Sequence, residues 1–310
     1  MPGQSLVAEL SPSGRQKHRL VGSRLFADYW ALTKPEVNFL ILITTGIGFY
    51  LGNASEARPL SYRALFNTLL GTLLVASGAG TLNQYIERKF DAQMRRTARR
   101  PAAAGRLKPA SVVVFGIALA VAGTVLLAAA INLLASVLAV LTLLTYLFVY
   151  TPLKRKTPLC VLVGAFPGAM PPLIGWAAAS GNLTLQAWTL YALLFLWQFP
   201  HFMAIAWMYR DDYDRAGYLV LPHDGKARGR FMNCQTLLPL LALALLSLLP
   251  GLTGTSRIFY WIGASFLSLG FLYYGIRFLV NKSASTARRL LVASIVYLPL
   301  LFFLIVVARD

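Results

Sequence analysis

The sequence predicts an all-helical protein that crosses a membrane about nine times. Of its 310 residues, 57% are hydrophobic and only 13% are charged, whereas about a quarter of an ordinary soluble domain is charged. Apolar runs of about 17 to 25 residues recur along the chain, and this length crosses the ~30 Å hydrocarbon core of a bilayer. Helices are expected because a spanning segment must satisfy its own backbone hydrogen bonds in lipid.

The apolar runs place the individual spans. The third and fourth are separated only by a short turn near Asn132, which predicts an antiparallel hairpin. A disordered cytosolic tail is expected over residues 1–27, and a single intramembrane domain over residues 28–310. The nine spans are expected at residues 34–52, 63–84, 109–131, 133–151, 158–179, 186–208, 234–252, 258–278 and 289–308.

The charge is strongly positive, at +18. Clustered Lys and Arg can indicate nucleic-acid binding, but here they lie in short loops between apolar runs. All but four of the 29 fall in the N-terminal segment and in alternate loops. By the positive-inside rule, the N-terminus and these loops are cytosolic and the C-terminus is outside. This arrangement predicts a multi-pass protein of the inner (cytoplasmic) membrane, with the lipid bilayer as partner and no nucleic acid.

The acidic residues share the same predicted face, which a topology rule does not require. Only Glu56 and Asp310 are expected on the other side. This asymmetry predicts a functional site at the cytosolic face. The acidic residues assigned to that face, outside the tail, are Asp28, Glu36, Glu87, Asp91, Asp211, Asp212, Asp214 and Asp224.

The first acidic motif ends the second span. If the helix continues, Asn83, Glu87 and Asp91 share one face because they are spaced by four residues. Mg²⁺ prefers hard oxygen ligands and usually keeps substrate phosphate oxygens in its shell, so this stripe suits a metal-bridged diphosphate. The alternative is a solvated helix end in which Glu87 pairs with a basic residue one turn away.

Two basic clusters accompany this motif. One run contains Arg96 and Arg100, and a compact loop contains Lys154 and Arg155. Guanidinium groups match phosphate oxygens in bidentate geometry, so Arg96 and Arg100 are candidates for diphosphate binding. The loop with Lys154 and Arg155 adds a compact cluster of cations on the same face. They could instead serve only as topological anchors.

The second acidic motif closes the sixth span. A helix that continues to Tyr213 would place His201 nearly three turns from Asp212, on a similar side. Gln198 and His201 would then lie deeper than the carboxylates, where polar groups tend to face a cavity. A purely structural histidine is the alternative.

Two other features of the apolar spans bear on the site. Pro167, Pro171 and Pro172 interrupt the fifth span, and such breaks in membrane helices usually border a cavity or a packed partner. Cys160 and Cys234 lie far apart without a CxxC spacing, and both are expected to be buried thiols.

Together these motifs resemble the UbiA superfamily of intramembrane prenyltransferases, and most closely its haem-farnesylating branch. The resemblance runs from about Asp28 to Pro222 and is weaker in the last three spans. The matching segments are Leu32-Thr33-Lys34-Pro35, Asn83 to Asp91, Arg96-Thr97, Arg100-Pro101, Tyr150-Thr151, Lys154-Arg155, Gly168-Ala169, Pro171 to Gly175, Trp197-Gln198, Pro200-His201, Asp212-Tyr213 and Ala216-Gly217.

The resemblance implies a nine-helix bundle with a central cavity, Mg²⁺, farnesyl diphosphate as donor and haem b as acceptor substrate. It also implies possible contact with haem A synthase or terminal-oxidase assembly factors. The residues that it implies for binding metal and diphosphate are Asn83, Glu87, Asp91 and Asp212, and it leaves open whether Asp211 or Asp214 joins them. The cations that it implies for the diphosphate are Arg96, Arg100, Lys154 and Arg155. The residues that it implies for the acceptor side are His201, Gln198 and Tyr213.

Departures from the pattern leave the acceptor more open than the donor. Tyr218-Leu219-Val220 stands where the haem branch usually has a Pro-Met sequence, and Leu159-Cys160 replaces a more polar pair. The alternatives are a prenyltransferase that acts on an aromatic or quinone precursor, a secondary transporter, and a non-catalytic haem-handling protein. A transporter is disfavoured because its ionisable groups would lie near the midplane between repeats.

Overall fold

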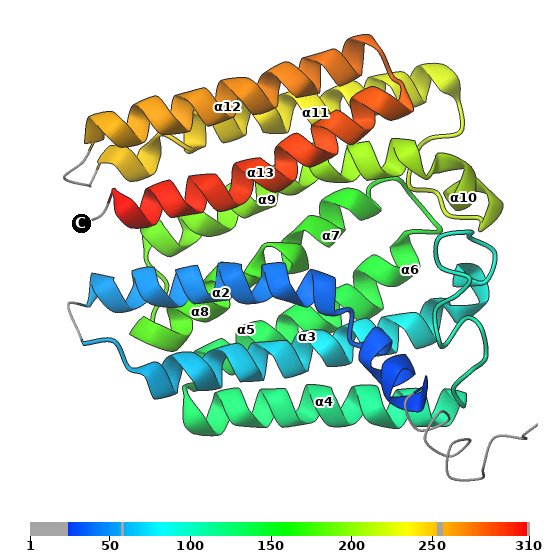
Figure 1. The fold of residues 1–310 in the computed structure, drawn as a ribbon, viewed down its shortest axis with the longest axis horizontal. Coiled ribbons are helices and arrows are strands. Elements are labelled where there is room, and N and C mark those ends of the chain that lie inside the picture. Colours follow the sequence, from blue (N-terminus) through cyan, green and yellow to red (C-terminus); the bar gives the residue numbers. More distant parts are fainter. Residues whose placement is uncertain (1–23, 57–58, 253–256, 309–310) are drawn as a thin grey trace, which may run out of the picture.

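The computed structural model describes residues 24–56, 59–252 and 257–308. Within these ranges, nine helical segments are long and apolar enough to cross a membrane, which confirms the expected fold class. They lie side by side in one bundle (Figure 1). The segments are α2 (Pro35–Ser55), α3 (Tyr62–Asp91), α4 (Pro109–Ala130), α5 with η1 and α6 (Leu133–Leu153), α7 and α8 (Cys160–Ser180), α9 (Leu185–Met208), α11 (Gly225–Leu246), α12 (Arg257–Val280) and α13 (Ala284–Val307).

Close helix packing depends on small residues. A Cβ on Gly78 of α3 would lie 2.7 Å from the carbonyl oxygen of Gly116 on α4. Similarly, a Cβ on Gly175 of α8 would lie 1.9 Å from the carbonyl oxygen of Thr45 on α2. In a membrane, helices associate largely through packing, so these glycines bring the backbones of neighbouring helices together.

Two spanning segments are interrupted. The fourth changes from α5 (Leu133–Leu144) to a π-helical turn, η1 (Thr145–Tyr150), before α6 (Thr151–Leu153). The fifth divides into α7 (Cys160–Gly168) and α8 (Met170–Ser180), whose first turn contains Pro171. Pro171 and Pro172 have no backbone N–H to donate, so the hydrogen-bond ladder is interrupted between α7 and α8, and the prolines lie in the first turn of the second helix.

The interrupted segments border a central cavity of about 580 Å³, as expected. Its wall is formed by α2, α3, α5, η1, α7, α8 and α9, with one residue from α13. Most of this wall is apolar, but Lys34, Asn38, Gln198 and His201 also line it. The size is typical of a ligand-binding cavity.

The connections that carry the predicted site lie at one end of the bundle, on the right in Figure 1. They are the end of α3, the loop that follows it, α6 and the short helix α10 (Arg210–Arg215). The described C-terminal end of α13 lies at the opposite end. An additional helix over residues 24–32 precedes α2 at the site end.

The structure differs from the expectations at the start of the seventh span and at Cys234, and it describes only part of the expected tail. The seventh span, predicted over 234–252, begins instead at Gly225, because Asp224 caps a polar but helical first turn by accepting the Ala227 N–H. Cys160 is buried as expected, but Cys234 is exposed on α11, since an outer helix turns part of its surface away from the protein. The expected tail lies outside the described residues up to residue 23, and residues 24–27 belong to the preceding helix.

Candidate active site

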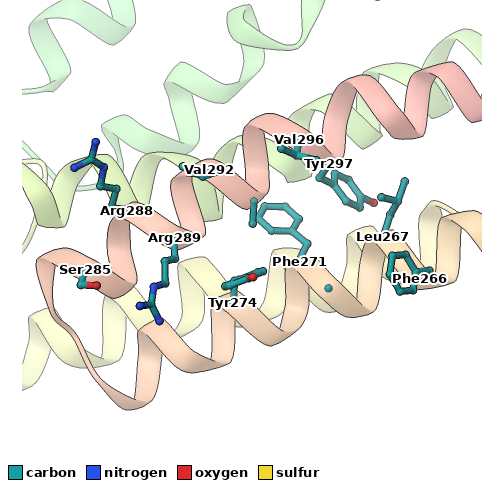
Figure 2. A pocket seen from close by; sticks show the side chains of 12 residues that line it. Phe266, Leu267, Phe271, Tyr274, Ser285, Arg288, Arg289, Val292, Val296 and Tyr297 are labelled. Atoms are coloured by element: carbon teal, nitrogen blue, oxygen red, sulfur yellow. The ribbon is translucent and has the colours of Figure 1, made fainter.

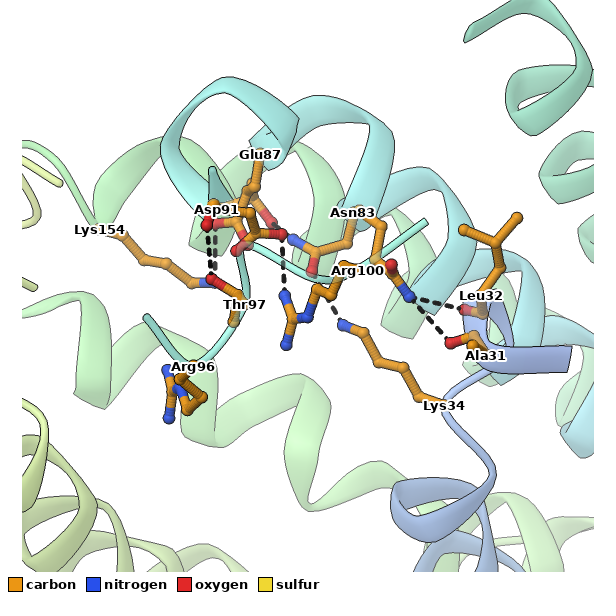
Figure 3. Close-up of polar contacts among 12 residues, drawn as sticks. Ala31, Leu32, Lys34, Asn83, Glu87, Asp91, Arg96, Thr97, Arg100 and Lys154 are labelled. Atoms are coloured by element: carbon orange, nitrogen blue, oxygen red, sulfur yellow. Dashed lines mark hydrogen bonds and ion pairs between the residues drawn. The ribbon is translucent and has the colours of Figure 1, made fainter. Parts of the chain in front are cut away.

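The first acidic motif lies on one face of α3. The helix continues to Asp91, so Asn83, Glu87 and Asp91 follow one another at intervals of about one turn. Their exposed fractions are only 1%, 5% and 1%. Figure 3 shows the two carboxylates close together, with Asn83 farther along the same helix. Buried carboxylates are costly unless opposite charges or a metal compensate them.

Three cations from three segments meet these side chains. The Lys34 Nζ donates to Asn83 Oδ1 at 3.0 Å, and the Lys154 Nζ donates to Glu87 Oε1 at 2.8 Å. Arg100 donates to Asp91 Oδ2 at 2.9 Å (Figure 3). The amide of Asn83 also donates to the hydroxyl of Thr151 at 3.1 Å. The ends of α3 and α6 and the start of α2 are therefore joined by polar contacts.

The charge of Lys154 is maintained despite its burial. Burial by itself would lower the pKa of this ammonium group, but Tyr150 and the Glu87 carboxylate outweigh that effect and raise the pKa above its ordinary value. The ammonium group also lies 4.5 Å from the centre of the Tyr150 ring. The Lys154 side chain is therefore a cation beside the acidic stripe.

The side-chain oxygens of Asn83, Glu87 and Asp91 fit a divalent metal that also binds oxygens of a substrate. Asp91 Oδ1 is buried and has no hydrogen-bond partner. In the described part of the chain, no three His, Cys, Asp or Glu side chains cluster tightly enough to hold a metal unaided. Because Mg²⁺ keeps water and phosphate oxygens among its ligands, a few protein oxygens at a phosphate site are sufficient.

The second motif supplies one buried carboxylate, Asp212 of α10. Its Oδ2 accepts the backbone N–H of Arg96 at 3.4 Å, and its Oδ1 pairs with Arg215 at 3.1 Å. The loop after α3 is also bonded to the first motif, since Thr97 donates its hydroxyl to the carbonyl oxygen of Asp91 at 2.9 Å. One loop thus connects two acidic motifs that are distant in sequence.

A second connection joins the two sides of the site. The backbone N–H of Leu219, which follows α10, donates to the carbonyl oxygen of Lys154 at 2.7 Å. The Arg96 side chain donates to the Tyr213 hydroxyl at 2.9 Å and lies over the ring of Tyr209 at 4.5 Å. These contacts hold the cation loop and the segment around α10 against each other.

Several predicted site residues are not brought to the buried carboxylates. Asp211 has a side chain that is 80% exposed and pairs only loosely with Arg210, at 3.5 Å. Asp214 is also exposed and lies 3.8 Å from His223. The Arg155 guanidinium lies over the ring of Phe90 at 4.6 Å. These three side chains surround the site rather than line its buried part.

His201 and Gln198 lie deeper, on α9, and line the cavity. The imidazole Nδ1 of His201 is 2.8 Å from the Ser294 hydroxyl of α13, and the ring stacks on Trp197 at 4.6 Å between centroids. The Gln198 amide donates to the carbonyl oxygen of Ala165 at 3.0 Å. By contrast, Tyr213 lies at the rim and is not among the residues that line the cavity.

Lys34 is a site residue that the motif analysis did not assign. It has a left-handed backbone, with φ at 53°, immediately before Pro35 and the start of α2. A residue before proline usually adopts an extended conformation, so the sequence gives no sign of this geometry. Such strained residues are often found at functional sites, and here the strain accompanies the contact with Asn83.

Tyr218 is a second unassigned residue. It is 3% exposed, and its buried hydroxyl lies near the Glu87 carboxylate without a hydrogen bond of normal geometry. Its ring packs near Phe90 and Tyr213, and the Lys154 Nζ lies 6.0 Å from the ring centre. Burial and the Glu87 charge raise the pKa of Tyr218, so the group remains a neutral phenol. The motif analysis noted this segment only as a departure from the family pattern.

Comparison with known proteins gives consistent results. Residues 41–305 match the UbiA prenyltransferase family. The chain is 45% identical over 292 residues to a protein named protoheme IX farnesyltransferase from Solibacter usitatus, covering 91% of this chain and 99% of the relative. A protein of the same name from Aquifex aeolicus is 39% identical over 283 residues, with 91% and 94% covered.

Solved structures show the same fold. A structure described as digeranylgeranylglyceryl phosphate synthase has a TM-score of 0.74 at 18% identity, covering 92% of this chain and 98% of that one. A UbiA homolog from Archaeoglobus fulgidus bound to GPP and Mg²⁺ has a TM-score of 0.61 at 15% identity, covering 90% and 99%. At these sequence identities, the similarity shows a common fold and nothing more.

Proposed function

Because the chain belongs to the UbiA prenyltransferase family, we propose that it transfers a farnesyl group from farnesyl diphosphate to a vinyl group of haem b, forming hydroxyethylfarnesyl haem (haem O). The relatives named protoheme IX farnesyltransferase support this reaction, since they match about nine tenths of the chain. The single structural observation that carries the proposal is the buried acidic stripe with its cations, joined to a largely apolar cavity by Lys34, which lines the cavity and contacts Asn83.

The diphosphate binds beside the acidic stripe, at the edge of the cavity that Lys34 lines. Asn83, Glu87 and Asp91, together with Asp212, would hold Mg²⁺, and the unpaired Oδ1 of Asp91 is a suitable metal ligand. The metal ion supplies positive charge that stabilises the leaving group. A UbiA homolog with bound GPP and Mg²⁺ supports a metal of this kind.

The cations of the site bind the phosphate oxygens. Lys34, Lys154 and Arg100 now contact Asn83, Glu87 and Asp91. Lys34 and Lys154 can each share hydrogens between the protein and a phosphate, because an ammonium group has three donors. Preorganised donors at the position where charge develops lower the barrier to bond cleavage. Arg96 and Arg155 approach the same rim from its outer side.

The farnesyl chain extends from the rim into the cavity of about 580 Å³. The C1–O bond of farnesyl diphosphate breaks, and the diphosphate leaves with both bonding electrons. The vinyl carbon of haem attacks the resulting allylic cation-like centre, and water adds to the neighbouring carbon and releases a proton. Apolar walls delay premature capture of the cation by water.

The acceptor side lies around His201. The imidazole borders the cavity and is oriented by Ser294 and Trp197. Gln198 supports the wall, because its amide is committed to the backbone of Ala165. We place haem b against this wall. Tyr213, which contacts Arg96 at the rim, has its role on the donor side in this arrangement.

The orientation follows from the basic loops. In the proposed topology the N-terminus and the site loops are cytosolic, and the C-terminus is outside, in the inner (cytoplasmic) membrane. The product would pass to haem A synthase or to terminal-oxidase assembly factors. Reporter fusions at residues 1 and 310 test the orientation: opposite signals are expected, and the same signal at both ends contradicts an odd number of spans.

The reaction is tested with purified full-length protein, farnesyl diphosphate and either haem b or 4-hydroxybenzoate, with Mg²⁺ or with a chelator. Mass spectrometry should find the hydroxyethylfarnesyl product with haem b, and only in the presence of the metal. Product from the aromatic acid alone would refute the proposed acceptor. Magnesium-independent substrate flux in sealed vesicles without any product would favour a transporter instead.

A further inference from the structure

A groove outside the active site runs along the surface between α12 and α13. Its volume is about 550 Å³. Figure 2 shows Ser285, Arg288 and Arg289 towards one end of the groove, and Phe266 and Leu267 towards the other. The groove is therefore cationic at one end and apolar along the rest of its length.

The shape of the groove depends on a glycine that helix packing does not require. A Cβ on Gly270 of α12 would meet no atom within 4 Å. On the same helix, a Cβ on Gly263 would lie 2.8 Å from Leu304, and one on Gly275 would lie 2.3 Å from Leu240. Gly263 and Gly275 thus bring helices together, whereas Gly270 leaves a hollow in the wall of the groove.

The two arginines have charge available for a ligand. Both are exposed, and no hydrogen bond or ion pair joins either side chain to another described residue. The sequence contains no Asp or Glu from Gly225 to Ala308. In the active site, by contrast, Arg100 is paired with Asp91. Figure 2 shows the two side chains leaving α13 in different directions, so each presents its own guanidinium fork at this end of the groove. A guanidinium group without an acidic partner favours a phosphate, which it can bind in bidentate geometry.

The groove also has a suitable length and position. From Arg288 to Val296 the α13 helix rises about 12 Å, at 1.5 Å per residue. One leaflet accounts for about half of the ~30 Å hydrocarbon core. The connection between α12 and α13 lies at the same end of the bundle as the active-site loops (Figure 1). An occupant with its head at Arg288 and Arg289 would therefore extend to about the middle of the bilayer.

We propose that this groove binds one anionic phospholipid of the leaflet that faces the active-site loops. The phosphate binds a guanidinium group at the basic end of the groove, where Arg288 and Arg289 both add positive charge, and one acyl chain lies along the hollow at Gly270. Basic pockets between transmembrane helices are a recognised arrangement for anionic head groups. A second copy of this chain is a poorer occupant, because the same basic surface on the copy would repel the two arginines.

The test is native mass spectrometry of the full-length protein with phosphatidylglycerol or phosphatidylcholine. Three variants are compared: the pair R288Q and R289Q, the single substitution G270L, and the pair K226Q and R230Q as a control. Lys226 and Arg230 are exposed at the same end of the bundle, on α11. The control therefore removes the same charge at another place.

The expected result is one retained phosphatidylglycerol that is selectively lost in two variants. Loss of both arginines should weaken its affinity about thirtyfold, equivalent to ~2 kcal/mol, from ~1 kcal/mol for each basic residue near an anionic surface. The G270L variant should lose the same lipid with an unchanged melting temperature, because its side chain enters open space. The control pair should retain the lipid.

Three outcomes would overturn the proposal. Equal retention of phosphatidylcholine would show that the site does not select an anionic head group. Equal loss in the control pair would assign the effect to general surface charge. In the D91N variant, whose active site is impaired, displacement of the lipid by low concentrations of farnesyl diphosphate would identify the groove as a substrate site instead.

Discussion

The two acidic motifs differ in how many carboxylates the chain buries. On α3 the polar side chains of Asn83, Glu87 and Asp91 are all buried along one continuous helix. On α10, a helix of six residues, the side chain of Asp212 is 11% exposed but that of Asp211 is 80% exposed. A long helix with a four-residue spacing aligns several groups, whereas consecutive residues point in different directions.

The partners of the two motifs differ as well. The α3 motif is met by cations from three other segments, at Lys34, Lys154 and Arg100. Asp212 pairs with one cation, Arg215 of its own helix, and also accepts a backbone N–H from Arg96 in the loop that follows α3. We infer that the α3 motif contributes most of the charge balance for the ligand, while Asp212 also positions the loop. Substitutions should therefore have unequal effects in the two motifs.

The largest effect is expected for D91N. This change removes one negative charge and the oxygen that has no partner, so charge stabilisation of the leaving group is weakened. We expect kcat to fall about a thousandfold, the upper part of the range for removal of one electrostatic stabiliser. Product formation measured over a Mg²⁺ titration checks this. Helical circular dichroism should be unchanged, and near-normal turnover would contradict the assignment.

A smaller effect is expected for D212N. Asn keeps an oxygen that can accept the Arg96 N–H, so the loop stays in position while the charge is lost. We expect activity to fall about a hundredfold, with a higher Mg²⁺ concentration needed for half-maximal rate. Steady-state rates at several Mg²⁺ concentrations measure both. A D212N loss as great as that of D91N would remove the proposed inequality between the motifs.

A further, smaller effect is expected for Y218F. The phenol hydroxyl lies near Glu87 but makes no hydrogen bond of normal geometry with the protein, so its removal should change the melting temperature little. If the hydroxyl donates to the bound diphosphate, KM for farnesyl diphosphate should rise about tenfold while kcat changes little, since one hydrogen bond to a charged group contributes about 1.5 kcal/mol. An unchanged KM would assign Tyr218 only to packing against Phe90.

The sequence was sufficient for features that depend on local pattern. Apolar run length gave the spanning segments, and the four-residue spacing gave the common face of Glu87 and Asp91. The beginning of α11 at Gly225 was missed because its first turns are polar and hydropathy detects only apolar sequence. An N-terminal cap at Asp224 was the available signal.

Other parts of the site depend on tertiary structure and could not be predicted. Lys34 reaches Asn83 across 49 positions of sequence through a left-handed backbone. Tyr218 lies in a segment without periodicity, and its burial arises from packing against Phe90. Whether Asp211 or Asp214 joins Asp212 depends on the rotation of α10, which its contacts with the loop after α3 constrain.

The smallest effect is expected for D211N. Its side chain is largely in solvent and its contact with Arg210 is long, so the charge is screened and little stability depends on it. We expect activity to change by less than about twofold and the melting temperature by less than about one degree, as is usual for exposed positions.

The D211N rates should be compared with those of D212N, which removes the same charge at the next residue. Equal and large losses in both variants would mean that α10 rotates when substrate binds, bringing Asp211 to the metal as well. The difference in burial between the two motifs would then describe only the ligand-free protein. A loss confined to D212N would show instead that one carboxylate from the second motif is enough, because three polar groups on α3 already supply the remaining oxygen donors.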